Sequence, residues 1–170
     1  LRLLIRDAVE RIEVAFRVDI ALLLSKRNAW APRIPDQLHS RFANAAPPHC
    51  HSQWLARHDE VENRSKEEFA AHFRRKYGGH MPLWMAIELW DFGMLSVFLS
   101  GMKDADVHEI AKKYGLPRRD LLKSWIRSIN YARNVAAHHN RLWNRGIVDQ
   151  PGVPKLGELP GLEARHAQRT

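Results

Sequence analysis

The chain has 170 residues, a length that suits one domain with an adequate hydrophobic core. Its composition is 45% hydrophobic and 27% charged, which is typical of a soluble globular protein. No uninterrupted apolar run approaches the roughly 18 to 20 residues that a membrane span needs, and charges within residues 1–7 disfavour a signal peptide. A single cysteine, Cys50, excludes an internal disulfide framework, so we expect a protein of the reducing cytoplasm.

The chain is strongly basic. Lysine and arginine number 27 against 19 aspartate and glutamate residues, which gives a formal net charge of +8. This excess favours nucleic acid or another polyanion as a partner. The alternative is an ordinary solvated basic surface, and charge by itself does not separate the two interpretations.

The hydrophobic pattern predicts five helices and no strand, and therefore an all-α fold. The first helix covers about residues 2–27, where apolar residues recur at helical spacing, and a break follows at residues 28–35. Residues 65–68 read Ser-Lys-Glu-Glu, a capping box that opens a second helix. Two glycines, Gly78 and Gly79, end that helix.

The third predicted helix begins at Pro82 and is apolar on nearly every side from residue 83 to residue 99. Such a helix is expected at the buried centre of a bundle. Two carboxylates, Glu88 and Asp91, interrupt it three residues apart. Because an ionised carboxylate is costly among apolar groups unless it is paired, both need a cationic partner elsewhere in the chain.

A short fourth helix is capped by Asp104 or Asp106, and Pro117 then opens a long final helix that runs toward Arg145. From residue 146 the chain is rich in proline and glycine, which predicts an extended or mobile tail that contributes little to the core. The sequence therefore divides into a helical domain, residues 1–145, and a tail, residues 146–170.

At about 100° per residue, the final helix has two contrasting stripes. One stripe is apolar and is expected to face the core: Leu122, Trp125, Ile129, Ala132, Ala136 and Trp143. The other is polar and largely basic: Lys123, Arg127, Asn134, His138, Arg141 and Arg145. This second stripe is either a solvated surface or a surface for a polyanion.

Residues 133–138 read Arg-Asn-Val-Ala-Ala-His and combine a permanent cation, an amide and a group that titrates near neutral pH. A guanidinium suits phosphate oxygens, and an imidazole accepts and donates protons. Asn134 and His138 are four residues apart, so the amide is expected to orient the imidazole. His139 and Asn140 extend the motif, either as contacts to phosphate or to a partner subunit, or as ordinary helix surface.

Arg133 lies about 100° from Asn134, toward the apolar stripe, so its guanidinium must reach outward or find a buried anion. We predict that Glu88, together with Asp91, orients Arg133. An equally reasonable interpretation is a buried ion pair that only fixes the register of two helices.

Metal-binding patterns are weak. Residues 49–51 read His-Cys-His, but adjacent ligands of this kind lack the separated-pair spacing of structural zinc sites. The sequence also contains no glycine-rich phosphate loop, Ser-His-Asp set or paired-carboxylate cluster. We therefore expect neither a metal nor a cofactor.

Four blocks in order, residues 8–17, 82–96, 124–132 and 133–138, resemble the bacterial Abi-like (abortive infection) proteins of the HEPN superfamily, whose signature is Arg-Asn-x-x-x-His. From the first block to the last they span most of residues 5–145. The resemblance implies a HEPN-like helical bundle and a metal-independent endoribonuclease that acts on RNA in phage defence or as a toxin.

In the implied reaction a ribose 2′-hydroxyl attacks its own phosphate, His138 acts as general base or acid, and Arg133 with Arg141 stabilises charge on the phosphoryl oxygens. Basic residues of the same helix are expected to bind the RNA: Lys123, Arg127 and Arg145. Because each chain has one motif, the resemblance implies a two-fold homodimer with a composite active site, Leu142 and Trp143 lying at the edge of the interface. It also allows a neutralising partner protein.

Two other functions compete with this one. The first is a noncatalytic helical module that binds RNA or a partner, with Arg133 and His138 kept for binding or structure. The second is a DNA-binding regulator, because residues 106–124 look superficially like a helix-turn-helix. A nuclease needs Arg133 and His138 in one solvent-reachable cleft, whereas a regulator needs an exposed recognition helix.

Overall fold

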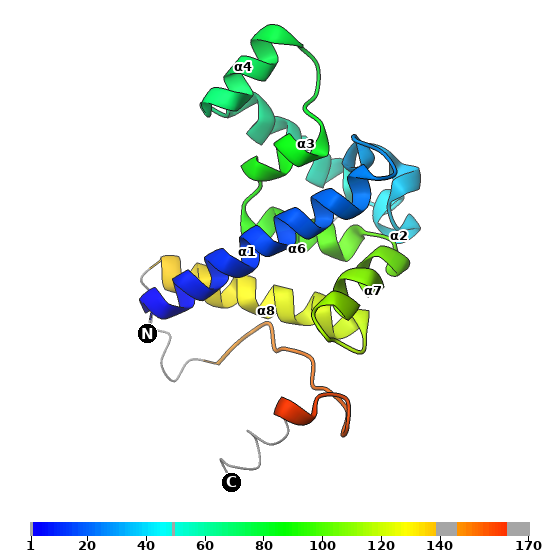
Figure 1. Ribbon diagram of the computed structural model, residues 1–170, viewed down its shortest axis with the longest axis vertical. Coiled ribbons are helices and arrows are strands. Elements are labelled where there is room, and N and C mark those ends of the chain that lie inside the picture. The colour runs from blue at the N-terminus through cyan, green and yellow to red at the C-terminus, as the bar shows by residue number, and fades with distance from the viewer. Residues whose placement is uncertain (1, 49, 139–145, 163–170) are drawn as a thin grey trace.

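The computed structural model describes residues 2–48, 50–138 and 146–162. These residues form helices and no strand, which confirms the all-α fold; Leu38 and Met102 form an isolated antiparallel bridge. Helices α1 (Arg2–Ser25), α6 (Phe92–Gly101) and α8 (Arg119–Ala137) pack together as the centre of the bundle (Figure 1). Helix α7 (Asp104–Lys113) packs against both α1 and α8.

Helix α1 forms because its apolar residues recur at helical spacing and bury one face, which includes Val9, Phe16 and Ile20. Hydrogen bonds to a buried carboxylate also hold α1 in the bundle. The buried carboxylate of Asp19 accepts hydrogen bonds from the Lys113 ammonium and, at 2.7 Å, from the Tyr114 hydroxyl. These bonds hold α1 beside the end of α7.

A segment that the hydrophobic pattern did not predict follows α1. It contains the 3₁₀ turns η1 (Ala31–Arg33) and η2 (Pro35–Gln37) and the helices α2 (Ser40–Ala43) and α3 (His51–Arg64). The buried face of α3 does repeat at helical spacing, but it consists of His51, Trp54, His58 and Glu62. Three of these four side chains are polar, so a search for apolar periodicity passes over the helix.

Helix α4 (Glu68–Lys76) ends at the predicted glycines, and Gly78 and Gly79 adopt left-handed φ angles of 62° and 66°. The predicted capping box is wrong. The helix begins only at Glu68, and the Ser65 hydroxyl accepts a hydrogen bond from the Glu67 N–H at 3.2 Å.

The third predicted helix is not continuous. It divides into α5 (Leu83–Ala86), the 3₁₀ turn η3 (Ile87–Leu89) and α6, with Trp90 in an extended conformation between them. The break arises because the Asp91 carboxylate accepts a hydrogen bond from the Met94 N–H at 2.8 Å and so caps α6. Glu88 is consequently carried by the turn and not by a buried helix.

The expected capping of the fourth helix by Asp104 or Asp106 is also incorrect. The residue before α7 is Lys103, and Asp104 lies in the first helical turn. The Asp106 carboxylate is buried and accepts two hydrogen bonds from Arg27, at 2.6 and 2.8 Å. This ion pair ties the end of α1 to α7.

Close packing fixes the short helix α2 on the end of α6. The His39 N–H donates to the Gly101 carbonyl at 2.9 Å. A Cβ atom added to Gly101 would lie 2.3 Å from the Phe42 ring, so only glycine allows this approach. The contact seats α2, and with it Arg41, beside the outer face of α6.

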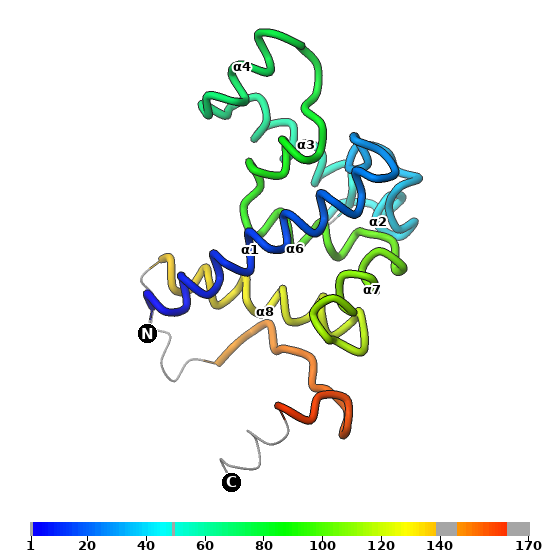
Figure 2. The backbone as a smooth tube through the Cα atoms, viewed as in Figure 1, coloured from blue at the N-terminus to red at the C-terminus, as the bar shows by residue number. Residues whose placement is uncertain are grey.

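The described part of the tail, residues 146–162, is extended and contacts the bundle, although none of its residues is buried in the core. Figures 1 and 2 show it running along α8. The Trp125 indole donates to the Gly152 carbonyl at 2.8 Å, and the Gly152 N–H donates to the Ser124 hydroxyl at 3.0 Å. Glu158 pairs with Arg118 at 2.8 Å, and Leu159 packs against the main core.

Candidate nucleic-acid interface along helix α8

Helix α8 has the two predicted faces. Leu121, Leu122 and Ile126 are buried, as are Val135 and Ala136 near its other end. The polar stripe faces outward: Arg127 is exposed, and Lys123 and Asn134 are half-buried. The helix ends at Ala137, whereas we expected it to continue toward residue 145. Four candidate residues lie outside the described part of the chain: His139, Asn140, Arg141 and Arg145.

Arg133, Asn134 and His138 lie together at the end of α8. His138 is exposed and caps the helix, its N–H donating to the Asn134 carbonyl at 3.0 Å. The Arg133 guanidinium donates to the Asn134 amide oxygen at 3.2 Å. The amide oxygen thus holds the guanidinium, where we had expected the amide to orient the imidazole.

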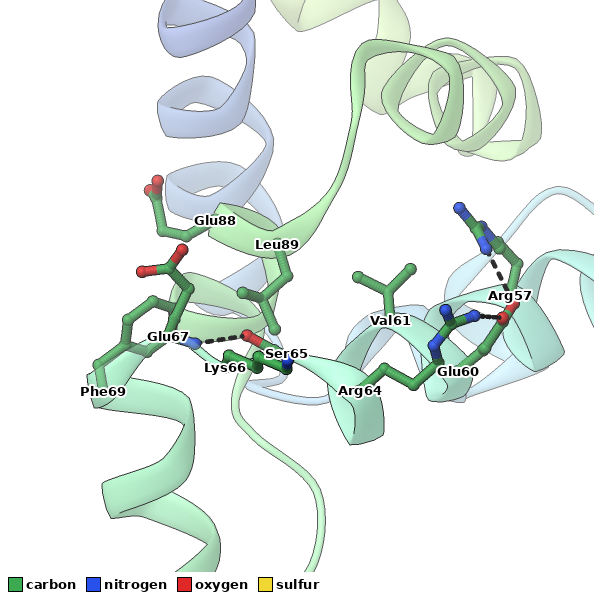
Figure 3. A pocket seen from close by; sticks show the side chains of 10 residues that line it. All are labelled: Arg57, Glu60, Val61, Arg64, Ser65, Lys66, Glu67, Phe69, Glu88 and Leu89. Carbon is green, nitrogen blue, oxygen red and sulfur yellow. Dashed lines mark hydrogen bonds and ion pairs between the residues drawn. The ribbon is translucent and has the colours of Figure 1, made fainter.

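Glu88 does not pair with Arg133, so this prediction is wrong. The Glu88 side chain is 53% exposed and lies 3.5 Å from the Arg17 guanidinium. Figure 3 shows Glu88 beside a cavity formed by α3, the start of α4 and η3, and none of the residues lining this cavity comes from α8. The physical reason is the break between α5 and α6, which turns Glu88 outward and uses Asp91 as a cap.

A basic groove lies along the polar stripe of α8. It is an open cavity of about 830 Å³ bounded by α2, α6, α8 and Asp149 of the tail. Four cationic side chains line it, Arg41, Arg119, Lys123 and Arg127, together with two carboxylates, Asp104 and Asp149. This excess of positive charge suits a phosphate-bearing ligand.

The cations of the groove differ in how they are engaged. Arg119 and Lys123 both pair with Asp104, at 3.0 and 3.6 Å, and Lys123 also donates to the Ser100 carbonyl. Burial lowers the pKa of Lys123, while Asp104 opposes that shift. Arg127 has no ion pair within residues 2–48, 50–138 and 146–162. Among the cations of α8 that line the groove, Arg127 is therefore the one best placed to bind an anion.

Sequence reasoning identified two groove residues, Lys123 and Arg127, and missed others, among them Arg119, Asn130, Arg41 and Asp149. Asn130 lies three residues beyond Arg127, so the period of α8 alone would have placed it on the same stripe. Arg41 comes from a helix of four residues and had no such signal.

A second polar cluster lies in the interior, where His58, Asp59 and Glu62 offer ligand atoms within 4.8 Å of one another. These groups already bind protein partners. The Arg33 guanidinium lies 2.6 Å from Asp59 and 2.8 Å from Glu62, and the Trp90 indole donates to His58 Nδ1 at 3.1 Å. The cluster therefore has a structural explanation, as an internal tie between α3 and the neighbouring segments.

The His-Cys-His segment has partners of its own in the described part of the chain, which excludes His49. His51 Nε2 lies 2.7 Å from the Pro32 carbonyl, and the Cys50 sulfur lies 3.1 Å from the Ser52 hydroxyl. Both side chains are buried. These contacts explain the two residues as packing and hydrogen-bonding groups of the turn before α3.

The fold and the groove define a helical bundle that presents a basic face along its final helix. The family model described as Abi-like protein matches residues 1–144, and the chain belongs to this family. Neither a curated protein nor a solved structure matches the chain. Among the residues that the structure describes, no helix combines the length and apolar character needed to cross a bilayer.

Proposed function

We propose that this protein is a metal-independent endoribonuclease of the HEPN type, acting on RNA in phage defence or as a toxin. Membership of the Abi-like family supports a role in abortive infection. The observation that carries the proposal is the position of His138, exposed at the end of α8 one turn from the hydrogen-bonded pair Arg133 and Asn134. The same helix lines the basic groove.

The reaction that these groups support is an internal transfer. His138 accepts the proton of a ribose 2′-hydroxyl, whose oxygen attacks the adjacent phosphorus. The bond to the 5′-oxygen breaks, and that oxygen leaves with a proton from a second acid. The products are a 2′,3′-cyclic phosphate and a free 5′-hydroxyl. The Arg133 guanidinium, held by Asn134, stabilises negative charge on the phosphoryl oxygens with its remaining N–H donors.

The second acid is the reason to expect a homodimer. The motif supplies one imidazole at the end of α8, and the His138 of a second copy would supply the other proton carrier across a two-fold axis. Light scattering at assay concentration tests this step. A monomer with full activity would refute the shared site and leave the internal transfer to be explained within one chain.

The test of the chemistry is cleavage of total RNA by the purified protein in excess EDTA, with analysis of the product ends. We expect 2′,3′-cyclic phosphate ends, intact DNA, and no cleavage by the His138→Ala or Arg133→Ala variants. The matched controls are His108→Ala on α7 and Arg75→Ala on α4, which are both exposed and do not line the basic groove, and both should keep the parent rate.

Three outcomes would overturn parts of the proposal. Cleavage at the parent rate by His138→Ala would remove His138 from the mechanism. Loss of activity in EDTA, restored by a divalent ion, would replace the metal-independent reaction. RNA binding without cleavage would favour a noncatalytic module, and a preference for duplex DNA would favour a regulator that uses α7 and α8.

A further inference from the structure

The groove along α8 contains polar groups that the protein itself leaves unengaged. Arg41 of α2 and Arg127 of α8 line it, and neither guanidinium has an ion pair within the described ranges. Asn130 also lines the groove, but its amide oxygen is buried and therefore out of reach of a ligand in the groove. Two guanidinium groups in one groove without an anionic partner point to an anionic ligand.

The chemistry of the two guanidinium groups limits what that ligand is. A guanidinium group binds phosphate oxygens, and each nucleotide of an RNA strand carries one phosphate. A concave groove admits one strand, whereas an A-form duplex presents a wide and shallow minor groove that needs a projecting surface.

We infer that the groove between α2, α6 and α8 is a binding subsite for single-stranded RNA, in which Arg41 and Arg127 contact phosphate. This inference rests on the proposed function and extends it. Arg127 and His138 are eleven residues apart, about 16 Å along a helix at 1.5 Å per residue. A stacked strand advances about 3.4 Å per nucleotide, so the subsite lies about five nucleotides from the reacting phosphate.

Asp149 of the tail limits the affinity of this subsite. Its main-chain carbonyl accepts a hydrogen bond from the Ser128 hydroxyl, which holds it against α8. Its carboxylate lines the groove with Arg127, where it repels a phosphate. Because the backbone carbonyl does the anchoring, Asp149→Asn removes the negative charge and keeps the anchor.

The experiment measures RNA binding and not cleavage. Full-length His138→Ala protein serves as the parent, and fluorescence anisotropy follows binding of labelled single-stranded RNA over a range of salt concentrations. We expect Arg127→Ala and Arg41→Ala each to weaken binding and to reduce the slope of log affinity against log salt by about 0.7, the value for one phosphate contact to a single strand. Arg75→Ala on α4 should match the parent.

A further variant predicts a change in the opposite direction. Asp149→Asn should tighten binding, a gain that misfolding does not produce. Oligonucleotides too short to reach from the reacting position to the subsite, a span of about five nucleotides, should bind the parent and Arg127→Ala equally.

Different results would refute the proposed subsite and the proposed nuclease activity. Parent-like affinity and salt slope for both Arg127→Ala and Asp149→Asn would refute the subsite even if cleavage by the native protein is confirmed. The expected binding changes in a native protein that cleaves no RNA would keep the subsite and refute the nuclease.

Discussion

His58 is expected to make the stability of this protein depend on pH. Its side chain is 3% exposed, and its ring stacks on Trp54 with 5.3 Å between centroids. Burial lowers the pKa of His58 to about 4, and the nearby Arg33 guanidinium adds to the shift, while Glu62 and Asp59 oppose it. The geometry agrees, because Nδ1 accepts the Trp90 indole N–H and is free to do so only in the neutral ring.

The size of the effect follows from linkage. The folded-state pKa of about 4 lies below the ordinary value of 6.5, so the unfolded chain binds more protons between these values. The stability contributed by neutral His58 is complete above about pH 6.5 and is lost as the pH falls toward 4. At about 1.4 kcal/mol per pH unit, the loss reaches about 2 kcal/mol at pH 5 and about 3 kcal/mol below pH 4.

Urea unfolding at pH 7.5 and pH 5, followed by tryptophan fluorescence, measures this loss. Other groups titrate in the same range, so the informative quantity is the difference between variants. His58→Gln should lose about 2 kcal/mol less than the native protein between the two pH values. The control His108→Gln, at an exposed position of α7, should lose as much as the native protein. Equal losses in all three proteins, or an NMR titration of His58 near pH 6.5, would refute the reasoning.

Three other substitutions test the packing of the bundle. Arg27→Ala should lower the free energy of unfolding by about 2 to 3 kcal/mol, because it leaves the buried Asp106 carboxylate without its partner, and a urea titration measures the change. Gly101→Ala should cost about 1 to 3 kcal/mol by forcing a Cβ against the Phe42 ring, seen as a lower Tm. Gly152→Ala places a Cβ 2.7 Å from a serine hydroxyl of α8, so limited proteolysis should cut its tail faster than that of the native protein.

The sequence was sufficient to predict helices whose buried faces are apolar. Helices α1 and α8 have apolar residues at helical spacing on their buried faces, and both were predicted, as was the end of α4 at two glycines. Helix α3 was missed because its buried face depends on hydrogen bonds between distant residues, such as His58 with Trp90. Such pairs exist only after the chain has folded, so a local pattern does not contain them.

The error at Glu88 has a different origin. Residues 83 to 99 are apolar on nearly every side, so they show no helical period. Their sequence therefore does not distinguish a continuous helix from a broken one. The capping of α6 by Asp91 decides between them and reverses the exposure of Glu88. Part of the groove was predicted, because α8 supplies its polar stripe. Arg41 and Asp149 enter the groove from other segments, which are docked by contacts between distant residues such as those at Gly101 and Ser128.

Because of how the tail is anchored, the folded unit extends further along the chain than the part whose sequence matches the family. Its carbonyl groups at Asp149 and Gly152 accept the bonds from α8, and any residue supplies a carbonyl. Related chains are therefore free to change most tail side chains while keeping the same attachment, and similarity would fade near residue 144 although packing continues. A protein cut at that point would leave Trp125 and Ser124 without their tail partners, and its behaviour would describe an incomplete domain.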